Sequence, residues 1–224
     1  MPASIAVYVE RGAKRSFVCA LDWPGWARSG RDEASALEAM LASAPRYAKV
    51  VAQSRLGFRA PTAVTQFRVV ERIAGDATTD FGAPSAVPRS DARAVTTAEL
   101  RRMEALIETA WRALDDAAKR ARGKSLAKGP RGGGRSLDKI LAHVREAETG
   151  YLSGLGWPFK PAKKDLVAQT RAAVLEGLRA SAHGEIAERG PRGGTRWKPR
   201  KFARRLAWHA VDHAWEIEDR GARS

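Results

Sequence analysis

The chain has 224 residues, a length that lies between one domain and two. Its composition, 44% hydrophobic and 29% charged, is that of an ordinary globular protein, and no apolar run is long enough for a membrane span. Residues 1–10 lack the features of a signal peptide, and the single Cys19 excludes internal disulfides and a cysteine-built zinc site. We therefore expect a cytoplasmic protein without a membrane partner.

Positive charge is spread unevenly along the chain. The net charge is +15, of which residues 1–80 carry +3 and residues 81–224 carry +12. Such an excess can indicate nucleic-acid binding. Arginine outnumbers lysine 29 to 11 and alanine is abundant, a bias that a GC-rich genome also produces. Nucleic acid therefore stays open as a partner, but it is not the favoured one.

Residues 1–75 have the pattern of a small α+β module. Residues 5–9 and 17–21 favour two strands, and turn residues between them favour a hairpin. After a turn at Pro24-Gly25, apolar residues spaced by three and four predict a helix over 32–50. A last strand is expected over 66–73. The predicted order is ββ(β)αβ, with a third strand left open before the helix.

Residues 76–95 lack periodicity, which predicts a linker. Residues 96–224 are expected to form four amphipathic helices. The first begins at the capping box of Thr96 and Glu99, and the second is capped by Ser136. The third is expected over 165–189, and the fourth from Pro199 to about residue 220. Four such helices predict a bundle, so we expect a two-domain α+β protein.

A glycine-rich segment occurs twice, at 129–135 and at 190–196, each time before a helix that carries histidine. Consecutive backbone N–H groups, together with Arg131 or Arg192, can form an anion-binding nest. A flexible turn without a binding role is the alternative.

His209 and His213 are the most informative residues of the last predicted helix. At about 100° per residue, both lie in the middle of the apolar face formed by Phe202, Leu206 and Ile217. Their spacing of four places two imidazoles one above the other, as two ligands of one metal ion require. Without a metal, two buried neutral histidines would each need a separate hydrogen-bond partner, so the pattern favours a metal site.

A third ligand is expected from another helix, and His143 flanks the apolar stripe of the second one. His143 lies about 10 Å from the start of its helix, and His209 and His213 lie about 15–22 Å from the start of theirs. These depths agree if the two helices are antiparallel. That arrangement requires a crossover from the second helix to the third, and residues 154–163 are long enough to supply it.

The segments LAHVREAE (141–148) and WHAVDHAWEIEDR (208–220) resemble the second and fourth helices of the DinB-like, or YfiT-like, superfamily. The resemblance covers about residues 96–220 and implies a four-helix bundle with a long connection between helices two and three. It also implies one divalent metal ion, zinc or nickel, held by a triad that corresponds to His143, His209 and His213. Some relatives are transferases or isomerases that use a low-molecular-weight thiol such as mycothiol or bacillithiol.

The expected reaction is a metal-dependent transfer or hydrolysis on a small-molecule substrate. Three histidine ligands leave one position open for water or a thiolate. Glu146 and Glu216 are the candidate catalytic carboxylates, as a base or as a group that orients a ligand histidine; solvated carboxylates without such a role are the alternative. Arg131, Arg145 and Arg192 are the candidate anion- and substrate-binding residues. A homodimer stays open as the assembly.

The motifs DWPG (22–25) and SGRDE (29–33) resemble a HicB-like module over residues 4–74. This resemblance implies a second hypothesis, a non-enzymatic interaction or regulatory protein that binds a protein or RNA partner and whose metal is structural or vestigial. Basic and aromatic residues alternate over 196–202, the best candidate for RNA binding. A di-iron bundle is disfavoured because the Glu-x-x-His pairs that it needs are absent.

Overall fold

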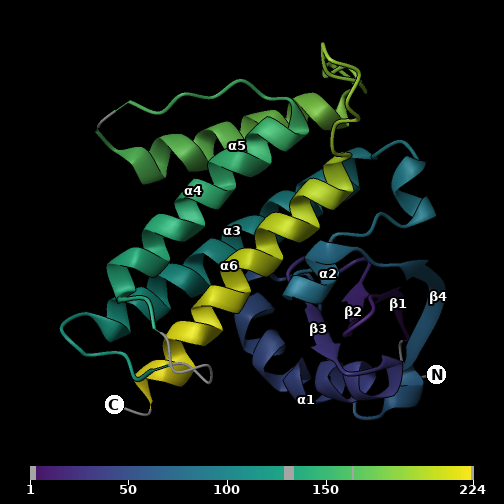
Figure 1. Cartoon of the computed structure of the whole chain (residues 1–224), viewed down its shortest axis with the longest axis vertical. Helices are drawn as coiled ribbons and strands as arrows, with labels where there is room; N and C mark the ends of the chain where they lie inside the picture. The colour runs from purple at the N-terminus through teal and green to yellow at the C-terminus, as the bar shows by residue number, and fades with distance from the viewer. Residues whose placement is uncertain (1–3, 129–133, 163, 223–224) are drawn as a thin grey trace.

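The computed structural model describes residues 4–128, 134–162 and 164–222. It is an α+β protein, as expected, with a small mixed sheet at the N-terminus followed by helices (Figure 1). The sheet order is β3-β2-β1-β4, in which β1 is antiparallel to β2 and parallel to β4. Its strands are β1 (Ile5–Arg11), β2 (Ser16–Ala20), β3 (Ala27–Gly30) and β4 (Phe67–Ala74).

Helix α1 (Glu33–Val51) joins β3 to the parallel strand β4, so the predicted element order is confirmed with the third strand present. Asp32 caps the helix by accepting a hydrogen bond of 2.8 Å from the backbone N–H of Ser35. Its buried face carries Met40 and Tyr47, and the Tyr47 ring stacks on Trp26 with centroids 5.2 Å apart. Aromatic packing therefore joins the turn after β2 to the helix that follows.

The segment 76–95, predicted to be a linker, is folded onto the rest of the molecule. It contains α2 (Ala77–Phe81) and a short 3₁₀ helix, Arg89–Ala92. The buried carboxylate of Glu10 in β1 accepts hydrogen bonds from the hydroxyl of Thr79 and the backbone N–H groups of Ser85 and Ala86. Single polar contacts of this kind, rather than a periodic apolar pattern, hold the segment, which is why its sequence resembles a linker.

Four longer helices follow: α3 (Thr97–Ala121), α4 (Leu137–Leu155), α5 (Leu166–Ala182) and α6 (Pro199–Gly221). The predicted caps are confirmed, since the side chain of Thr96 accepts from the N–H of Glu99 and that of Ser136 from the N–H of Lys139. The expected end of the third helix at residue 189 is wrong. Helix α5 ends at Ala182, and Gly184 then adopts a left-handed conformation with φ of 77°, which stops the helix.

Contacts between helix ends define the relative direction of α4 and α6. At the start of α6, the N–H of Trp197 donates to the carbonyl of Gly154 at the end of α4, and at its other end Arg220 donates to the carbonyl of Arg135, just before α4. Helices α4 and α6 are therefore antiparallel, as the histidine depths predicted. The connection from α4 to α5 returns from the end of α4 toward its beginning, so α4 and α5 point the same way (Figure 1).

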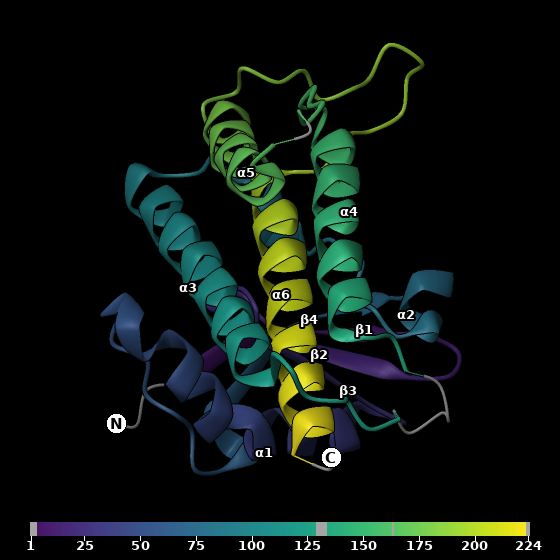
Figure 2. The ribbon, with the colours of Figure 1, turned by 90° about the vertical axis from the view of Figure 1, so that its left-hand side faces the viewer.

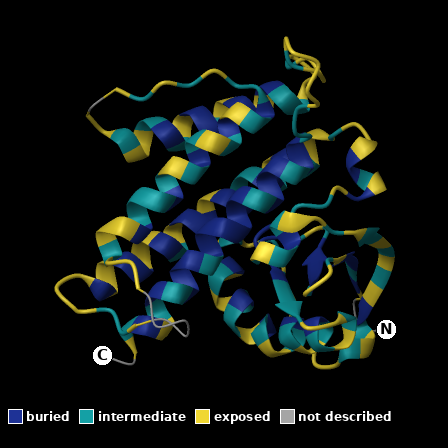
Figure 3. Ribbon diagram, viewed as in Figure 1, coloured by how far each residue is buried: buried dark blue, intermediate teal, exposed yellow. Residues whose placement is uncertain are grey.

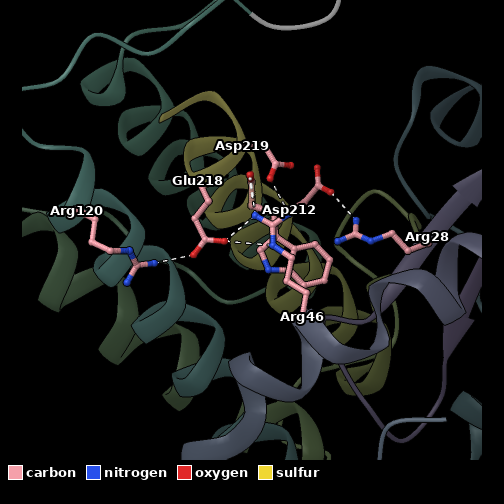
Figure 4. Close-up of polar contacts among 7 residues, drawn as sticks. Arg28, Arg46, Arg120, Asp212, Glu218 and Asp219 are labelled. Carbon is pink, nitrogen blue, oxygen red and sulfur yellow. Dashed lines mark hydrogen bonds and ion pairs between the residues drawn. The ribbon is translucent and has the colours of Figure 1, made fainter. Parts of the chain in front are cut away.

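Helix α6 is the central element of the molecule. Figure 2 shows it between α3 and α4, and in Figure 3 most of its length is buried. Its outer side also contacts the N-terminal module through a polar network (Figure 4). Arg46 of α1 binds Glu218 at 2.6 Å and Asp219 at 2.8 Å, while Arg28 of β3 binds Asp212 at 3.0 Å. One continuous cluster of buried apolar residues runs from the sheet through α1 into α3 and α6.

Candidate metal centre

The structure brings the three predicted histidines together between α4 and α6. His143, His209 and His213 each offer one ring nitrogen, and these three atoms lie within 4.8 Å of one another. Nε2 of His209 is 3.1 Å from Nε2 of His213, and the ring centroid of His143 is 5.1 Å from each of the other two. His209 and His213 are buried and His143 is half-buried. The nitrogens therefore converge on one point at the edge of the core.

Glu216 and Arg220 continue this arrangement along α6. Nδ1 of His213 lies 2.7 Å from Oε2 of Glu216, and Nη1 of Arg220 donates to Oε1 of the same carboxylate at 2.7 Å. The hydrogen bond to His213 and the guanidinium of Arg220 hold the pKa of Glu216 below its usual range. A carboxylate that accepts the Nδ1–H of His213 leaves Nε2 with a free lone pair, directed at the other two histidines.

Burial keeps two of the three histidines, His209 and His143, in the neutral form that binds metals. Desolvation, followed by the neighbouring His213 and His143, lowers the pKa of His209 to about 2. Desolvation and the positive charge of Arg135 also lower the pKa of His143. Because only unprotonated imidazole nitrogen can bind a metal, these shifts remove a proton competitor from the site.

The donor set fits a tetrahedral divalent ion. Three nitrogens bound to one zinc ion at about 2.05 Å lie roughly 3.3 Å apart. The His209–His213 separation of 3.1 Å is already close to that value, so only His143 has to approach. One imidazole lacks an orienting group: among the described residues, no hydrogen-bond partner meets the buried Nδ1 of His209. The chemistry of the three donors suits zinc or nickel and leaves a fourth position free.

Two further side chains lie beside the triad. The Tyr151 ring is 5.7 Å from that of His209 in an edge-on arrangement, and its hydroxyl accepts a hydrogen bond of 3.2 Å from Nε of Arg205. Arg205 also donates to the carbonyl of Pro84 at 2.8 Å, so it fixes Tyr151 relative to the segment before α3. A phenol and a guanidinium beside the triad can bind an oxygen of a ligand.

The other predicted site residues do not offer an atom to the point where the three histidines converge. Glu146 is exposed, and Glu216 is occupied by His213 and Arg220, which fits the role of orienting a ligand better than that of a free base. Arg145 is half-buried and lines a cavity between α3, α4 and α5, away from the triad. Arg192 is exposed in the loop before α6, and Arg131 lies outside the described residues.

The second glycine-rich segment forms a closed turn. The N–H of Gly190 donates to the carbonyl of Gly194 at 2.8 Å, and the N–H of Gly193 donates to the carbonyl of Gly190 at 2.9 Å. These two donors are used within the loop and are not free for an anion. The first segment, 129–135, lies largely outside the described residues.

The basic and aromatic stretch 196–202 is packed into the fold. Phe202 is fully buried, and the buried Arg200 donates to the carbonyl of Arg93 and to Glu99. Trp197 is half-buried, with its ring centroid 5.4 Å from that of Tyr151. The Phe202 ring therefore cannot stack on a base, and the Trp197 ring is partly covered by its contact with Tyr151.

Sequence reasoning missed Arg220 and Glu148. Arg220 follows Glu216 by four residues, a spacing that signals an ion pair on one helix face. Glu148 follows Val144 by four on the buried side of α4, and its Oε1 accepts a hydrogen bond of 2.6 Å from the indole N–H of Trp111. The first signal was available from spacing alone, whereas the partner of Glu148 comes from another helix.

Comparison with family models, with curated proteins and with solved structures found no match for this chain. None of the helices in the described part of the chain combines the length and the apolar character of a membrane-spanning segment.

Proposed function

We propose that the chain binds one divalent metal ion, zinc or nickel, through His143, His209 and His213. The observation that carries this proposal is the convergence of three ring nitrogens within 4.8 Å of one another. They come from two helices, and His143 and His209 are 66 residues apart along the chain. The ordering of His213 by Glu216 and of Glu216 by Arg220 supports it, because ligand histidines in metal sites are held by such carboxylates.

The reaction that this site supports best is a metal-dependent transfer or hydrolysis on a small-molecule substrate. A bound ion with three nitrogen ligands lowers the pKa of a thiol or a water molecule at its open position. In this proposal Glu216 and Arg220 position His213, and the hydroxyl of Tyr151, whose ring lies 5.7 Å from that of His209, donates to an oxygen of the substrate. Glu146 stays a candidate base at the exposed side of α4.

The proposal agrees with the resemblance of residues 96–220 to the DinB-like superfamily, whose bundle topology and thiol-dependent members provide its reaction class. A low-molecular-weight thiol such as mycothiol is the proposed co-substrate. For residues 4–74 we propose a HicB-like module, without assigning a regulatory role to it. In the stretch 196–202 Phe202 is fully buried and Trp197 is half-buried against Tyr151, so the enzyme is the hypothesis that we carry forward.

Metal content tests the site directly. We expect near-stoichiometric zinc or nickel by mass spectrometry in gently purified, untagged protein, and its loss in the His209→Ala/His213→Ala double variant. His183→Ala is the matched control, because this histidine is exposed at the end of α5 and away from the triad. A metal-free wild-type protein that also takes up neither Zn²⁺ nor Ni²⁺ on reconstitution would end the proposal.

A second measurement separates a reactive centre from a structural one. Co²⁺ substituted into the site gives absorption bands that depend on its ligands. We expect these bands to shift when mycothiol or cysteine is added to the wild-type protein. Stoichiometric cobalt with bands that ignore added thiol would support a metal site without thiol chemistry.

A further inference from the structure

A cavity lies between α3, α4 and α5, and none of the three histidines lines it. It has a volume of about 270 Å³ and opens on the side of α4 opposite to His143. One water molecule occupies roughly 30 Å³ in the liquid, so the cavity accommodates about nine water-sized groups. This is the size of a small organic molecule.

The inner wall of the cavity is apolar. Leu114, Ala118 and Val144 are buried side chains from α3 and α4 that face it. Val167 of α5 is at its rim and 48% exposed, the kind of apolar surface that a ligand can cover. A ligand with a short apolar chain would therefore bury it against this wall.

Cations surround the opening. Lys119, Arg122 and Arg145 line the cavity, and in the described part of the chain none of these three side chains has an ion pair. Arg171 also lines it but is neutralised by Asp115, with both hydrogen bonds at 2.7 Å. The unpaired positive charge of the rim selects for an anionic group.

Among the described residues that line the cavity, Glu148 is the one buried ionisable group. Its Oε1 is used by Trp111, and the described residues place no other donor on the carboxyl. Burial raises its pKa to about 7, so near neutrality it can carry a proton and donate it to a ligand oxygen. In its neutral form Glu148 does not repel an anionic ligand, whereas its carboxylate would, so the neutral form favours anion binding in the cavity.

We propose that this cavity binds a small carboxylate with a short apolar chain, held by Lys119, Arg122 and Arg145 at its anionic end and by Leu114, Ala118 and Val144 along its chain. The site is independent of the proposed metal centre. It gives the protein a second ligand class, a binding function beyond the reaction at the triad.

The test uses hexanoate, whose eight non-hydrogen atoms fit the volume, with hexan-1-ol and acetate as comparison probes. The readout is the ¹⁵N–¹H signal of the Trp111 indole, assigned by Trp111→Phe, because this N–H donates to Glu148 at the cavity wall. We expect a saturable shift of this signal with hexanoate and much weaker responses with hexanol, which lacks the charge, and acetate, which lacks the chain.

Two sets of variants locate the site. Lys119→Gln/Arg145→Gln should weaken hexanoate binding by about tenfold, since charge-assisted contacts are lost. Ala118→Leu should abolish binding by filling the cavity. Arg101→Gln is the control, an exposed arginine on α3 that does not line the cavity, and should bind normally.

The His209→Ala/His213→Ala variant should also bind hexanoate normally, which keeps this result separate from that of the metal proposal. Equal affinity for hexanol and hexanoate, or unchanged binding in Ala118→Leu, would overturn the proposed site. An absence of any shift at millimolar hexanoate would do the same.

Discussion

Nδ1 of His213 lies 2.7 Å from Oε2 of Glu216, less than one helical turn further along α6. The contact decides which nitrogen of His213 faces the triad, because a carboxylate acceptor at Nδ1 keeps the proton there. Arg220 holds the carboxylate from its other side and is itself tied to the carbonyls of Ala127 and Arg135. The position of a proposed ligand therefore depends on the connection between α3 and α4.

The first prediction concerns this contact. Glu216→Gln removes the charge that fixes the Nδ1–H of His213 and weakens the hold of Arg220. We expect affinity for Zn²⁺ to fall by about 10- to 100-fold, the usual effect of losing such an orienting group. Competition with a chromogenic chelator measures it.

Glu176→Gln serves as the control, since Glu176 is an exposed carboxylate of α5 with no ion pair among the described residues. Equal zinc affinity in Glu216→Gln and wild type would mean that Glu216 does not orient the ligand. A loss of folding in the variant would show in its circular dichroism spectrum and is separable from a loss of metal.

The second prediction concerns the buried ion pair of Asp91 and Arg204. The two side chains are joined by hydrogen bonds of 2.9 and 2.5 Å, and both are nearly inaccessible to solvent. Asp91→Ala leaves the guanidinium buried without its partner, so we expect the free energy of unfolding to fall by about 3–5 kcal/mol in urea denaturation.

Replacing both residues with apolar ones, Asp91→Leu with Arg204→Met, should recover most of that loss because no charge is then left unpaired. Glu188→Ala, which breaks an exposed pair with Lys198, should have little effect. A small effect of Asp91→Ala would mean that segment 76–95 contributes little to holding α6 against the sheet.

The long amphipathic elements were predictable because their patterns are local. The Thr96–Glu99 capping box and Pro199 mark helix starts, and the structure has both where the sequence places them. The convergence of His143 with α6 also followed from sequence, since depth along a helix is a simple function of residue number. Its use of a metal stays a prediction.

Features that depend on partners far apart in sequence were not predictable. Segment 76–95 is held by Glu10 and by Asp91, single polar residues whose partners lie 69 and 113 positions away at Thr79 and Arg204. Glu148 could be placed on the inner face of α4, but nothing local indicates that Trp111 would meet it. Such pairs leave no periodic trace in the sequence, and each has to be found in the folded chain.

The third prediction concerns the stability of the protein against pH. The folded-state pKa of Glu148 is raised to about 7 by burial, against roughly 4.3 in the unfolded chain. Between these values the folded state holds a proton that the unfolded state has lost, so stability falls as pH rises from about 4 to 7 and is level above. Glu148→Gln removes this dependence while keeping an oxygen for the indole of Trp111.

Wild type should therefore lose on the order of 2–3 kcal/mol of unfolding free energy on going from pH 5 to pH 8 through this group, and Glu148→Gln should not. The stability of the variant relative to wild type should rise by that amount over the same range. Urea denaturation at the two pH values measures the difference. Glu146→Gln, an exposed carboxylate on the same helix, should change by the same amount at both. A constant difference for Glu148→Gln would mean that this carboxyl titrates normally.

The fourth prediction joins this titration to the proposed cavity. The other charged groups that line the cavity with Glu148 are Asp115 and Lys119 of α3, Arg122 just after α3, Arg145 of α4 and Arg171 of α5. Because burial raises the pKa of Glu148 to about 7, the charge of this carboxyl changes between pH 6 and pH 8. Hexanoate should bind more tightly at pH 6, where Glu148 is protonated, than at pH 8, where its carboxylate repels the ligand. The Trp111 indole signal follows both titrations.

In Glu148→Gln the affinity for hexanoate should be the same at both pH values. A pH dependence that persists in this variant would come from another group, and Glu148 would then have no part in binding.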